Sequence, residues 1–95
     1  MENQKYIIRT SDNDIHFAEI ESRIDGEAVL RNSRRIWYWS GAASTSQLAV
    51  DGVANPNECK FTIVVPKMTI RNIVEIIPCT EKATESLSGV KVWRR

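Results

Sequence analysis

The chain has 95 residues, of which 42% are hydrophobic and 26% charged, and a formal net charge of +1. This length supports one core and predicts a single domain over residues 1–95, while the apolar content argues against disorder. A net charge this small argues against a protein that coats duplex nucleic acid through many phosphate contacts, because any attraction for phosphate must come from local clusters of basic residues. No apolar run reaches the roughly 18 residues that cross a bilayer, and the amino terminus lacks the layout of a secretory signal. We therefore expect an intracellular protein without a membrane or duplex partner.

The first third of the chain predicts short strands joined by turns. Tyr6–Arg9 is a β-branched run that ends in the turn formers Thr10–Asp14. Ile15–Leu30 mixes apolar and polar residues in strand fashion around Asp25-Gly26, a dipeptide that favours the two-residue turn of a hairpin. We expect a hairpin over this segment.

A further strand is expected after the hairpin. Asn32-Ser33 permits a second turn, and Arg34–Ser40 is rich in the aromatic residues that strands favour. Side chains alternate across a strand, so this segment should present two different faces. One face would carry Arg35, Trp37 and Trp39, and the other Arg34, Ile36, Tyr38 and Ser40.

Two short helices are expected, each preceded by a capping residue. Ser44 has a glutamine three residues further on, the spacing of a capping box, which predicts a helix over Thr45–Asp51. Thr80 is suited to cap a second helix that runs to about Leu87, with Gly89 as its stop.

The segment between the two helices predicts more strands. Asn55–Asn57 is typical of a loop, Lys60–Val65 of a strand that Pro66 ends, and Ile70–Ile77 of another strand. About five or six short strands with two short helices predict an α+β fold. The sheet should be a small curled antiparallel β-sheet or barrel.

The segment Arg31–Ser46 holds the candidate ligand site. It sets three arginines beside three aromatic residues. Guanidinium groups bind phosphate oxygens through paired hydrogen bonds, and aromatic rings stack on nucleobases. The start of the predicted helix offers free backbone amides to an anion. The candidate ligand-binding residues are Arg34, Arg35, Trp37, Trp39, Ser44, Thr45 and Ser46.

A structural role for the same segment stays open. Two tryptophans that are two residues apart on a strand are often core or dimer-interface anchors, and the arginines can pair with Glu19, Glu21 and Asp25. Alternation also keeps one face of the strand from using all of the candidate side chains. Which face is buried is not decided by the sequence.

No catalytic residue, metal site or cofactor is expected. Asp12, Asp14 and His16 lie close together, but their spacing fits no calcium loop, and a turn rich in Asp and Asn explains them more simply. Cys59 and Cys79 have no metal-binding neighbours and are expected to be reduced core or strand-end residues. With one histidine and no clear carboxylate pair, the sequence favours a protein that is not an enzyme.

Five short runs carry a resemblance to known proteins. They are Arg34–Ala42, Ser46–Ala49, Gly52-Val53, Pro56–Phe61 and Glu75–Thr80. In these runs the chain resembles a family of small, uncharacterised proteins of tailed phages and prophages. The resemblance implies a phage or prophage origin and transfers no catalytic residue.

Phage proteins of this size are often accessory factors that interfere with host defence, and some sequester nucleotide second messengers at oligomer interfaces. By analogy, we expect a homo-oligomeric, anti-defence binding protein of the host cytoplasm whose partner is a nucleotide second messenger. Trp93-Arg94-Arg95 is either a contact to a neighbouring subunit or a frayed end. The alternative is a protein-interaction module that docks on a host or phage protein through the aromatic strand.

Overall fold

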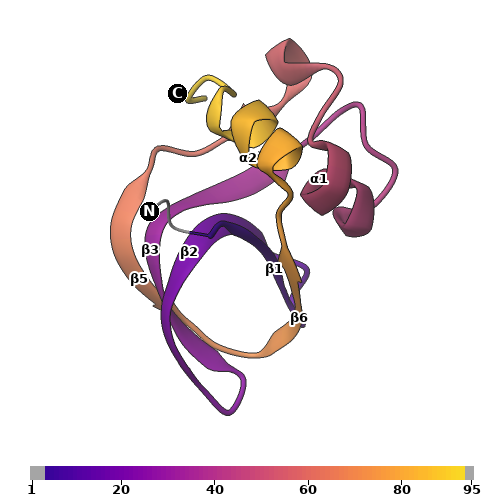
Figure 1. Ribbon diagram of the computed structural model, residues 1–95. Helices are drawn as coiled ribbons and strands as arrows, with labels where there is room; N and C mark the ends of the chain where they lie inside the picture. The colour runs from indigo at the N-terminus through magenta and orange to yellow at the C-terminus, as the bar shows by residue number, and fades with distance from the viewer. Residues whose placement is uncertain (1–3, 94–95) are drawn as a thin grey trace.

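The structure is a computed structural model that describes residues 4–93. It has an α+β fold, as expected, in which a curled antiparallel sheet of six strands is accompanied by two helices (Figure 1). In chain order the elements are β1 (Tyr6–Thr10), β2 (Ile15–Ile24), β3 (Glu27–Tyr38), α1 (Thr45–Asp51), the 3₁₀ helix η1 (Pro56–Glu58), β4 (Lys60–Phe61), β5 (Val65–Ile70), β6 (Ile73–Pro78) and α2 (Glu81–Ser88).

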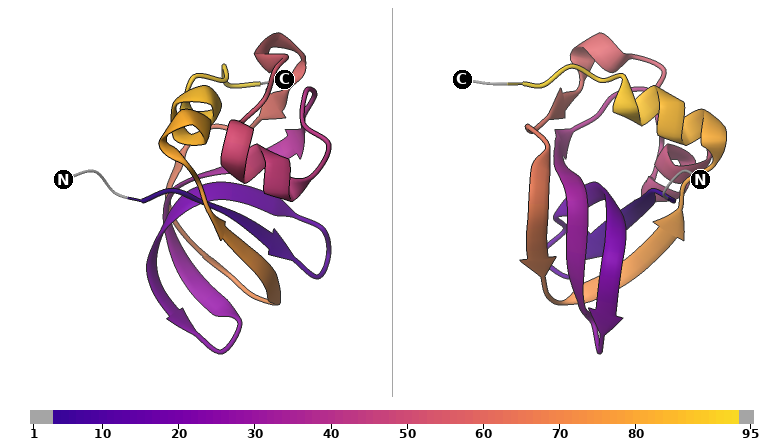
Figure 2. Two further views of the ribbon diagram at one scale, coloured as in Figure 1. Left: turned by 45° about the vertical axis from the view of Figure 1, so that its right-hand side comes forward. Right: turned by 60° about the vertical axis from the view of Figure 1, so that its left-hand side comes forward.

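The long strand β3 organises the sheet. One of its edges pairs with β2, and the other pairs with β5 and then, near the end of the strand, with β4. β1 and β6 continue the sheet beyond β2. Within residues 4–93 no ladder joins β5 to β6, so the sheet curls without closing into a barrel (Figure 2).

Both helices cover one face of the sheet at one end of its curl (Figure 2). Each helix contributes an apolar side to the core beneath it, because burial of that side stabilises a helix too short to persist alone. The largest buried residues of this helix-side core are Ile7, Ile15, Phe17, Ile36, Leu48, Phe61 and Leu87.

The opposite, concave face holds a second, smaller cluster. Ile70 of β5 belongs to it and Ile73 of β6 packs against it, although the two strands are not paired. Neighbouring residues of β2 divide between the two faces, Phe17 toward the helices and Ala18 into the concave cluster. This is the alternation that a pleated strand imposes.

The predicted hairpin at Ile15–Leu30 is confirmed. β2 and β3 pair around the Asp25-Gly26 turn, with Ile24 opposite Glu27. Asp25 has a φ of +46° and Gly26 a φ of +77°. Two successive positive φ angles are what a two-residue hairpin turn requires, which explains the Asp-Gly pair.

Asn32 does not begin a turn, contrary to the sequence expectation. β3 runs unbroken through it, and Asn32 has a φ of +51° where the ladder between β2 and β3 shifts register. This is a β-bulge, which adds one residue to one strand. Leu30 before the bulge belongs to the concave cluster and Ile36 after it to the helix-side core, although both positions are even-numbered. Even-numbered residues of β3 therefore face the concave cluster before the bulge and the helices after it.

The strands after α1 differ most from the prediction. Only Lys60–Phe61 form β4, and the strand end predicted at Pro66 is wrong, because this proline is the second residue of β5. β5 pairs with β3 alone among the described strands, and an edge strand tolerates a residue that has no N–H. The predicted strand Ile70–Ile77 is interrupted at Arg71-Asn72, where Asn72 has a φ of +59°.

Both helix predictions are confirmed, and the residue that caps α2 also contacts α1. The Ser44 hydroxyl accepts a hydrogen bond from the Gln47 N–H at 3.2 Å. The Thr80 hydroxyl accepts from the Ala83 N–H at 3.0 Å and donates to the Val50 carbonyl at 2.6 Å. The cap of α2 therefore also satisfies a carbonyl at the end of α1.

Cys59 and Cys79 are buried with free thiols, as expected for core and strand-end residues. Burial raises the pKa of the Cys79 thiol to about 11, against a smaller opposing effect of Lys5. A thiol with so high a pKa is a poor nucleophile at neutral pH. Over residues 4–93, no helix is long and apolar enough to cross a membrane.

Candidate functional site

Arg35 and Trp37 line a hollow of about 300 Å³ together with Asn13 and Asp14. The first two lie near the end of β3, and the last two lie in the turn between β1 and β2. Trp37 is 66% exposed, whereas the neighbouring Arg34 is buried. The expected alternation therefore holds here, and it places a cation and an aromatic ring on the same open face.

The turn between β1 and β2 fixes the wall of this hollow. The Asn13 N–H donates to the Thr10 carbonyl at 2.9 Å, and the Thr10 hydroxyl accepts from the Asp14 N–H at 3.3 Å. Arg9 donates to the Asn13 side-chain oxygen at 3.5 Å and pairs with Glu75 at 3.3 Å. Side-chain contacts thus connect the turn to β6.

Trp37 also belongs to an aromatic pair. Its ring centroid lies 5.9 Å from that of Trp93, with 46° between the ring planes, and Lys60 Nζ lies 5.1 Å from the Trp93 centroid. The Trp93 N–H donates to the Phe61 carbonyl at 2.8 Å, which attaches the segment after α2 beside β4. Trp93 thus packs within its own chain, while Arg94-Arg95 lie outside the described residues.

Arg34 does not reach this hollow, although it was a candidate for the same site. Its guanidinium donates to the carbonyls of Thr62 and Leu87 at 3.1 and 3.2 Å and lies 5.0 Å from the centroid of the Phe61 ring. It is on the helix-side face of β3, and Arg35 is on the other. The two arginines therefore lie on opposite faces of the sheet.

Trp39 is also separate from the Trp37 hollow. It packs, half-buried, against the helix-side core, and its Nε1–H donates to the Ala42 carbonyl at 3.0 Å. The ladder between β3 and β4 shifts register between Ile36 and Tyr38. This irregularity ends the alternation, so the prediction that Trp39 shares a face with Trp37 is wrong.

The predicted ligand-binding residues at the start of α1 lie in a third place, away from both Arg35 and Arg34. The Ser44 hydroxyl caps the helix, the Thr45 hydroxyl donates to Glu75 at 2.8 Å, and Ser46 is exposed. The Thr45 bond, followed by the ion pair with Arg9, lowers the pKa of Glu75. None of these three α1 positions lines the hollow of Arg35 and Trp37.

His16 lies beneath Arg35 on the neighbouring strand. The two residues are paired in the ladder, and the imidazole is 1% exposed with no hydrogen-bond partner at Nδ1. Burial, and then the charge of Arg35, lower its pKa to about 4, against a smaller opposing effect of Asp14. The imidazole is therefore neutral at neutral pH.

Residues 3–87 match one family model, described as Domain of unknown function (DUF6948). The chain belongs to the DUF6948 family. No curated protein and no solved structure gives a significant match to it.

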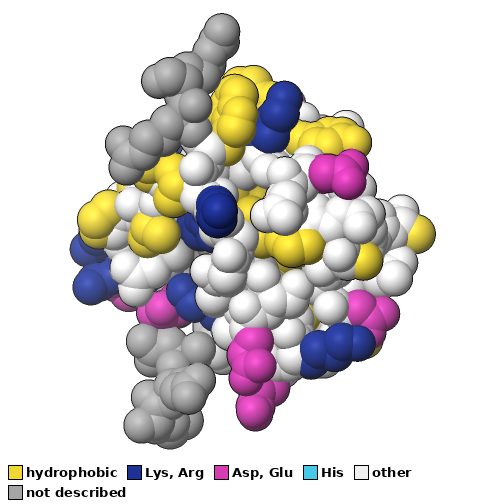
Figure 3. All heavy atoms as spheres, turned by 90° about the horizontal axis from the view of Figure 1, so that it is seen from above, with side chains coloured by type: hydrophobic (Ala, Val, Ile, Leu, Met, Phe, Trp, Pro, Cys, Tyr) yellow, Lys and Arg dark blue, Asp and Glu magenta, His cyan; other side chains and the backbone are white. Residues whose placement is uncertain are grey.

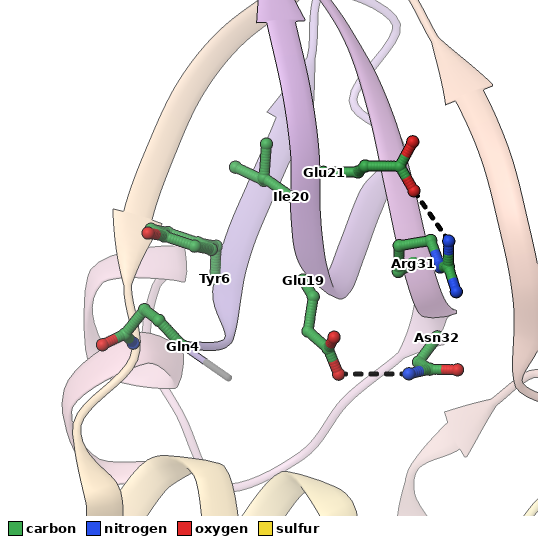
Figure 4. Close-up of a pocket in the computed structure, with 7 residues that line it drawn as sticks. All are labelled: Gln4, Tyr6, Glu19, Ile20, Glu21, Arg31 and Asn32. Carbon is green, nitrogen blue, oxygen red and sulfur yellow. Dashed lines mark hydrogen bonds and ion pairs between the residues drawn. The ribbon is translucent and has the colours of Figure 1, made fainter. Parts of the chain in front are cut away.

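A second hollow of this DUF6948 chain, of about 390 Å³, lies over the middle of β2 and β3 (Figure 4). Its charged side chains, Glu19, Glu21 and Arg31, all have partners within the chain. Glu21 pairs with Arg31 at 2.7 Å, and Glu19 accepts a hydrogen bond from Asn32 at 3.1 Å (Figure 4). The Arg31 hydrogen bond is the main cause that lowers the pKa of Glu21. Arg31 thus makes the ion pair that the structural interpretation of the sequence proposed.

Part of the hollow at Arg35 and Trp37 was not predicted from the sequence. The turn predicted at Asn13 and Asp14 is confirmed, but their position beside Trp37 depends on the pairing of the strands, which the sequence does not show. Lys60 was not singled out because a lone lysine on a strand carries no signal. In the part of the chain that the structure describes, no group of three or more His, Cys, Asp or Glu residues is placed to hold a metal ion.

Proposed function

We propose that this DUF6948 protein binds a nucleotide-type ligand in the hollow of Arg35 and Trp37 and holds it without cleaving it. The observation that carries the proposal is the exposed Trp37 ring with Arg35 on the same face and a polar turn opposite. A free indole face stacks on any nucleobase, contributing about 1–3 kcal/mol. A guanidinium provides paired donors for phosphate oxygens.

The turn residues complete the set of contacts that such a ligand needs. The Asp14 carboxylate can accept hydrogen bonds from ribose hydroxyls or from an exocyclic amino group. The Asn13 amide is held by Arg9 and can donate to a phosphate oxygen. Base, sugar and phosphate would each have a partner in one hollow. Sequestration needs no bond to break, because tight binding alone removes a free ligand.

The biological setting of this proposal rests on the resemblance to small phage and prophage proteins. In that setting the protein is an accessory, anti-defence factor in the host cytoplasm, and its ligand is a nucleotide second messenger of the host. A homo-oligomer could complete the hollow with residues of a second copy. A strict monomer in solution would remove that part of the proposal.

Replacing Trp37 or Arg35 with alanine should weaken ligand binding by about tenfold or more, since each loses one stacking or charge-assisted contact. Both side chains are exposed, so folding should be nearly unaffected. The measurement is thermal shift and calorimetry with a panel of cyclic dinucleotides and ADP-ribose-type molecules, and circular dichroism checks the fold.

Two further variants serve as controls. Tyr38→Ala removes an exposed aromatic residue that does not line the hollow, and it should leave binding unchanged. Trp39→Ala removes a ring packed against the core and should cost about 2 kcal/mol of stability. If Trp37→Ala lowers the stability as much as Trp39→Ala does, the ring is structural and the ligand proposal fails.

A protein-interaction module is the second candidate, and a separate observation favours it. Exposed apolar side chains gather beside β4, where the chain after α2 and the segment between β4 and β5 run next to the end of β3. From the helix end, apolar side chains form several patches with Lys and Arg beside them (Figure 3). The exposed apolar residues near β4 are Trp37, Tyr38, Ile63, Val64 and Val92.

The two candidates differ in what binds and in which residues matter. A ligand recovered intact after denaturation of the loaded protein supports sequestration, and a cleaved product would indicate an enzyme. No thermal shift across the panel, together with a stable host-protein complex that Ile63→Asp abolishes, would support the interaction module instead. Ile63 does not line the hollow, so this substitution leaves the nucleotide site intact.

A further inference from the structure

Arg34 is a buried charge for which residues 4–93 provide no counter-charge. It is 5% exposed, and its two hydrogen bonds go to the backbone carbonyls of Thr62 and Leu87. Among residues 4–93, no carboxylate lies within ion-pair distance of its guanidinium, and Nη2 has no hydrogen-bond partner. Burial lowers the pKa of this group, yet an arginine stays charged. Buried charges in proteins are normally paired, so this one calls for an anion.

A cavity of about 290 Å³ adjoins this guanidinium. It lies between the start of β1, the middle of β3 and the end of α2 with the segment after it. Its polar wall consists of Lys5, Asn32, Arg34 and Ser88. The apolar part comes from Phe17, Val64, Val90 and Val92. A cavity of this size is at the lower end of the range for small-molecule sites.

The charges around the cavity indicate the charge of its occupant. Lys5 Nζ lies 3.1 Å from Glu19 and 5.5 Å from the centroid of the Phe17 ring. The Lys5–Glu19 pair is neutral as a unit, so among the described residues at the cavity Arg34 leaves a charge of +1. One monoanion balances this charge, whereas a phosphate dianion would exceed it and would lie near Glu19.

We propose that this cavity binds a small monocarboxylate with a branched aliphatic or aromatic substituent. The carboxylate would face Arg34 and Lys5, and the substituent would lie against the valines and Phe17. This site is on the helix-side face of β3, so it is separate from the Trp37 hollow and does not depend on the proposed nucleotide function.

The test titrates the ¹⁵N-labelled full chain with isovalerate and follows the Arg34 Nε–H and Asn32 side-chain amide signals by NMR. Both should shift and saturate. Acetate, which lacks the apolar substituent, should bind more weakly by a factor of about ten or more. Isovaleramide has the same shape without the charge and should give no saturable shift.

Two substitutions of serine by glutamate give a matched comparison. Ser88→Glu places a carboxylate at the cavity and should weaken isovalerate binding about tenfold, because like charges repel at close range. Ser22→Glu changes an exposed residue of β2 that does not line the cavity and should have no effect. Trp37→Ala should also leave isovalerate binding unchanged.

Three results would overturn the proposal. They are the absence of a saturable shift with isovalerate, equal shifts with isovalerate and isovaleramide, and unchanged affinity in the Ser88→Glu variant. The comparison of acid and amide uses the unmodified chain, so it remains decisive if the Ser88 variant folds poorly. Loss of isovalerate binding in Trp37→Ala would assign the acid to the other hollow.

Discussion

Replacing Gly52 with alanine should lower the free energy of unfolding by about 3 kcal/mol. Gly52 ends α1 with a φ of +77° and a ψ of −148°, a conformation that side chains rarely allow. A Cβ built there lies 2.4 Å from both Cβ and Oγ of Ser86 on α2. The Ser86 hydroxyl accepts from the Val53 N–H at 3.1 Å, so it cannot move away freely. Chemical denaturation measures the loss.

Gly89 provides the matched control. It caps α2 with a φ of −83° and a ψ of −6°, within the right-handed helical region, and an added Cβ would approach no atom closer than 3.5 Å. Gly89→Ala should therefore change stability by less than about 1 kcal/mol. Equal losses in the two variants would show that the contact between α1 and α2 at Gly52 is not as close as described.

Acidification from pH 7 to pH 5 should remove about 2 kcal/mol of stability through His16 alone. Burial, followed by the charge of Arg35, lowers its pKa from 6.5 to about 4 in the folded chain. Below pH 6.5 the unfolded chain binds a proton that the folded chain does not, so stability falls with pH until both forms are protonated below about 4. The lowered pKa values of Glu21 and Glu75 act in the same direction, but mainly at lower pH, since carboxyl groups ordinarily titrate near pH 4.

NMR can measure this pKa directly, because the chain has one histidine. The imidazole signal should titrate near pH 4. Arg35→Gln should raise that pKa by removing a repelling cation, and Asp14→Asn should lower it further by removing the attracting carboxylate. A midpoint at or above 6.5 in the unmodified protein would contradict the burial of His16.

Local signals in the sequence were sufficient where a few neighbouring residues decide the conformation. The Asp25-Gly26 turn and the Ser44 and Thr80 caps are of this kind, since each depends on contacts within four residues. The bulge at Asn32 and the place of Pro66 in β5 depend on which strand lies alongside. Which strands pair with one another cannot be predicted from a single sequence.

The candidate site was predictable to the same extent. Alternation alone puts Arg35 and Trp37 on one face and Arg34 on the other, and the structure agrees. Which of these faces the helices cover was not decidable, because both carry arginine and aromatic residues. The grouping of Trp39 with Trp37 failed because the strand becomes irregular before it.

The bulge at Asn32 has a consequence for how related chains are aligned. It determines which of two adjacent arginines is inside, because β3 changes its facing at that residue. A relative that lacks this one residue should keep its buried arginine at the position aligned with Arg34, because in the regular strand that remains Leu30 and Ile36 would be five positions apart and would still face opposite sides. An alignment of a relative with a regular β3 should therefore open a gap at Asn32, and without that gap the buried arginine of one chain would be matched to the solvent-facing arginine of the other.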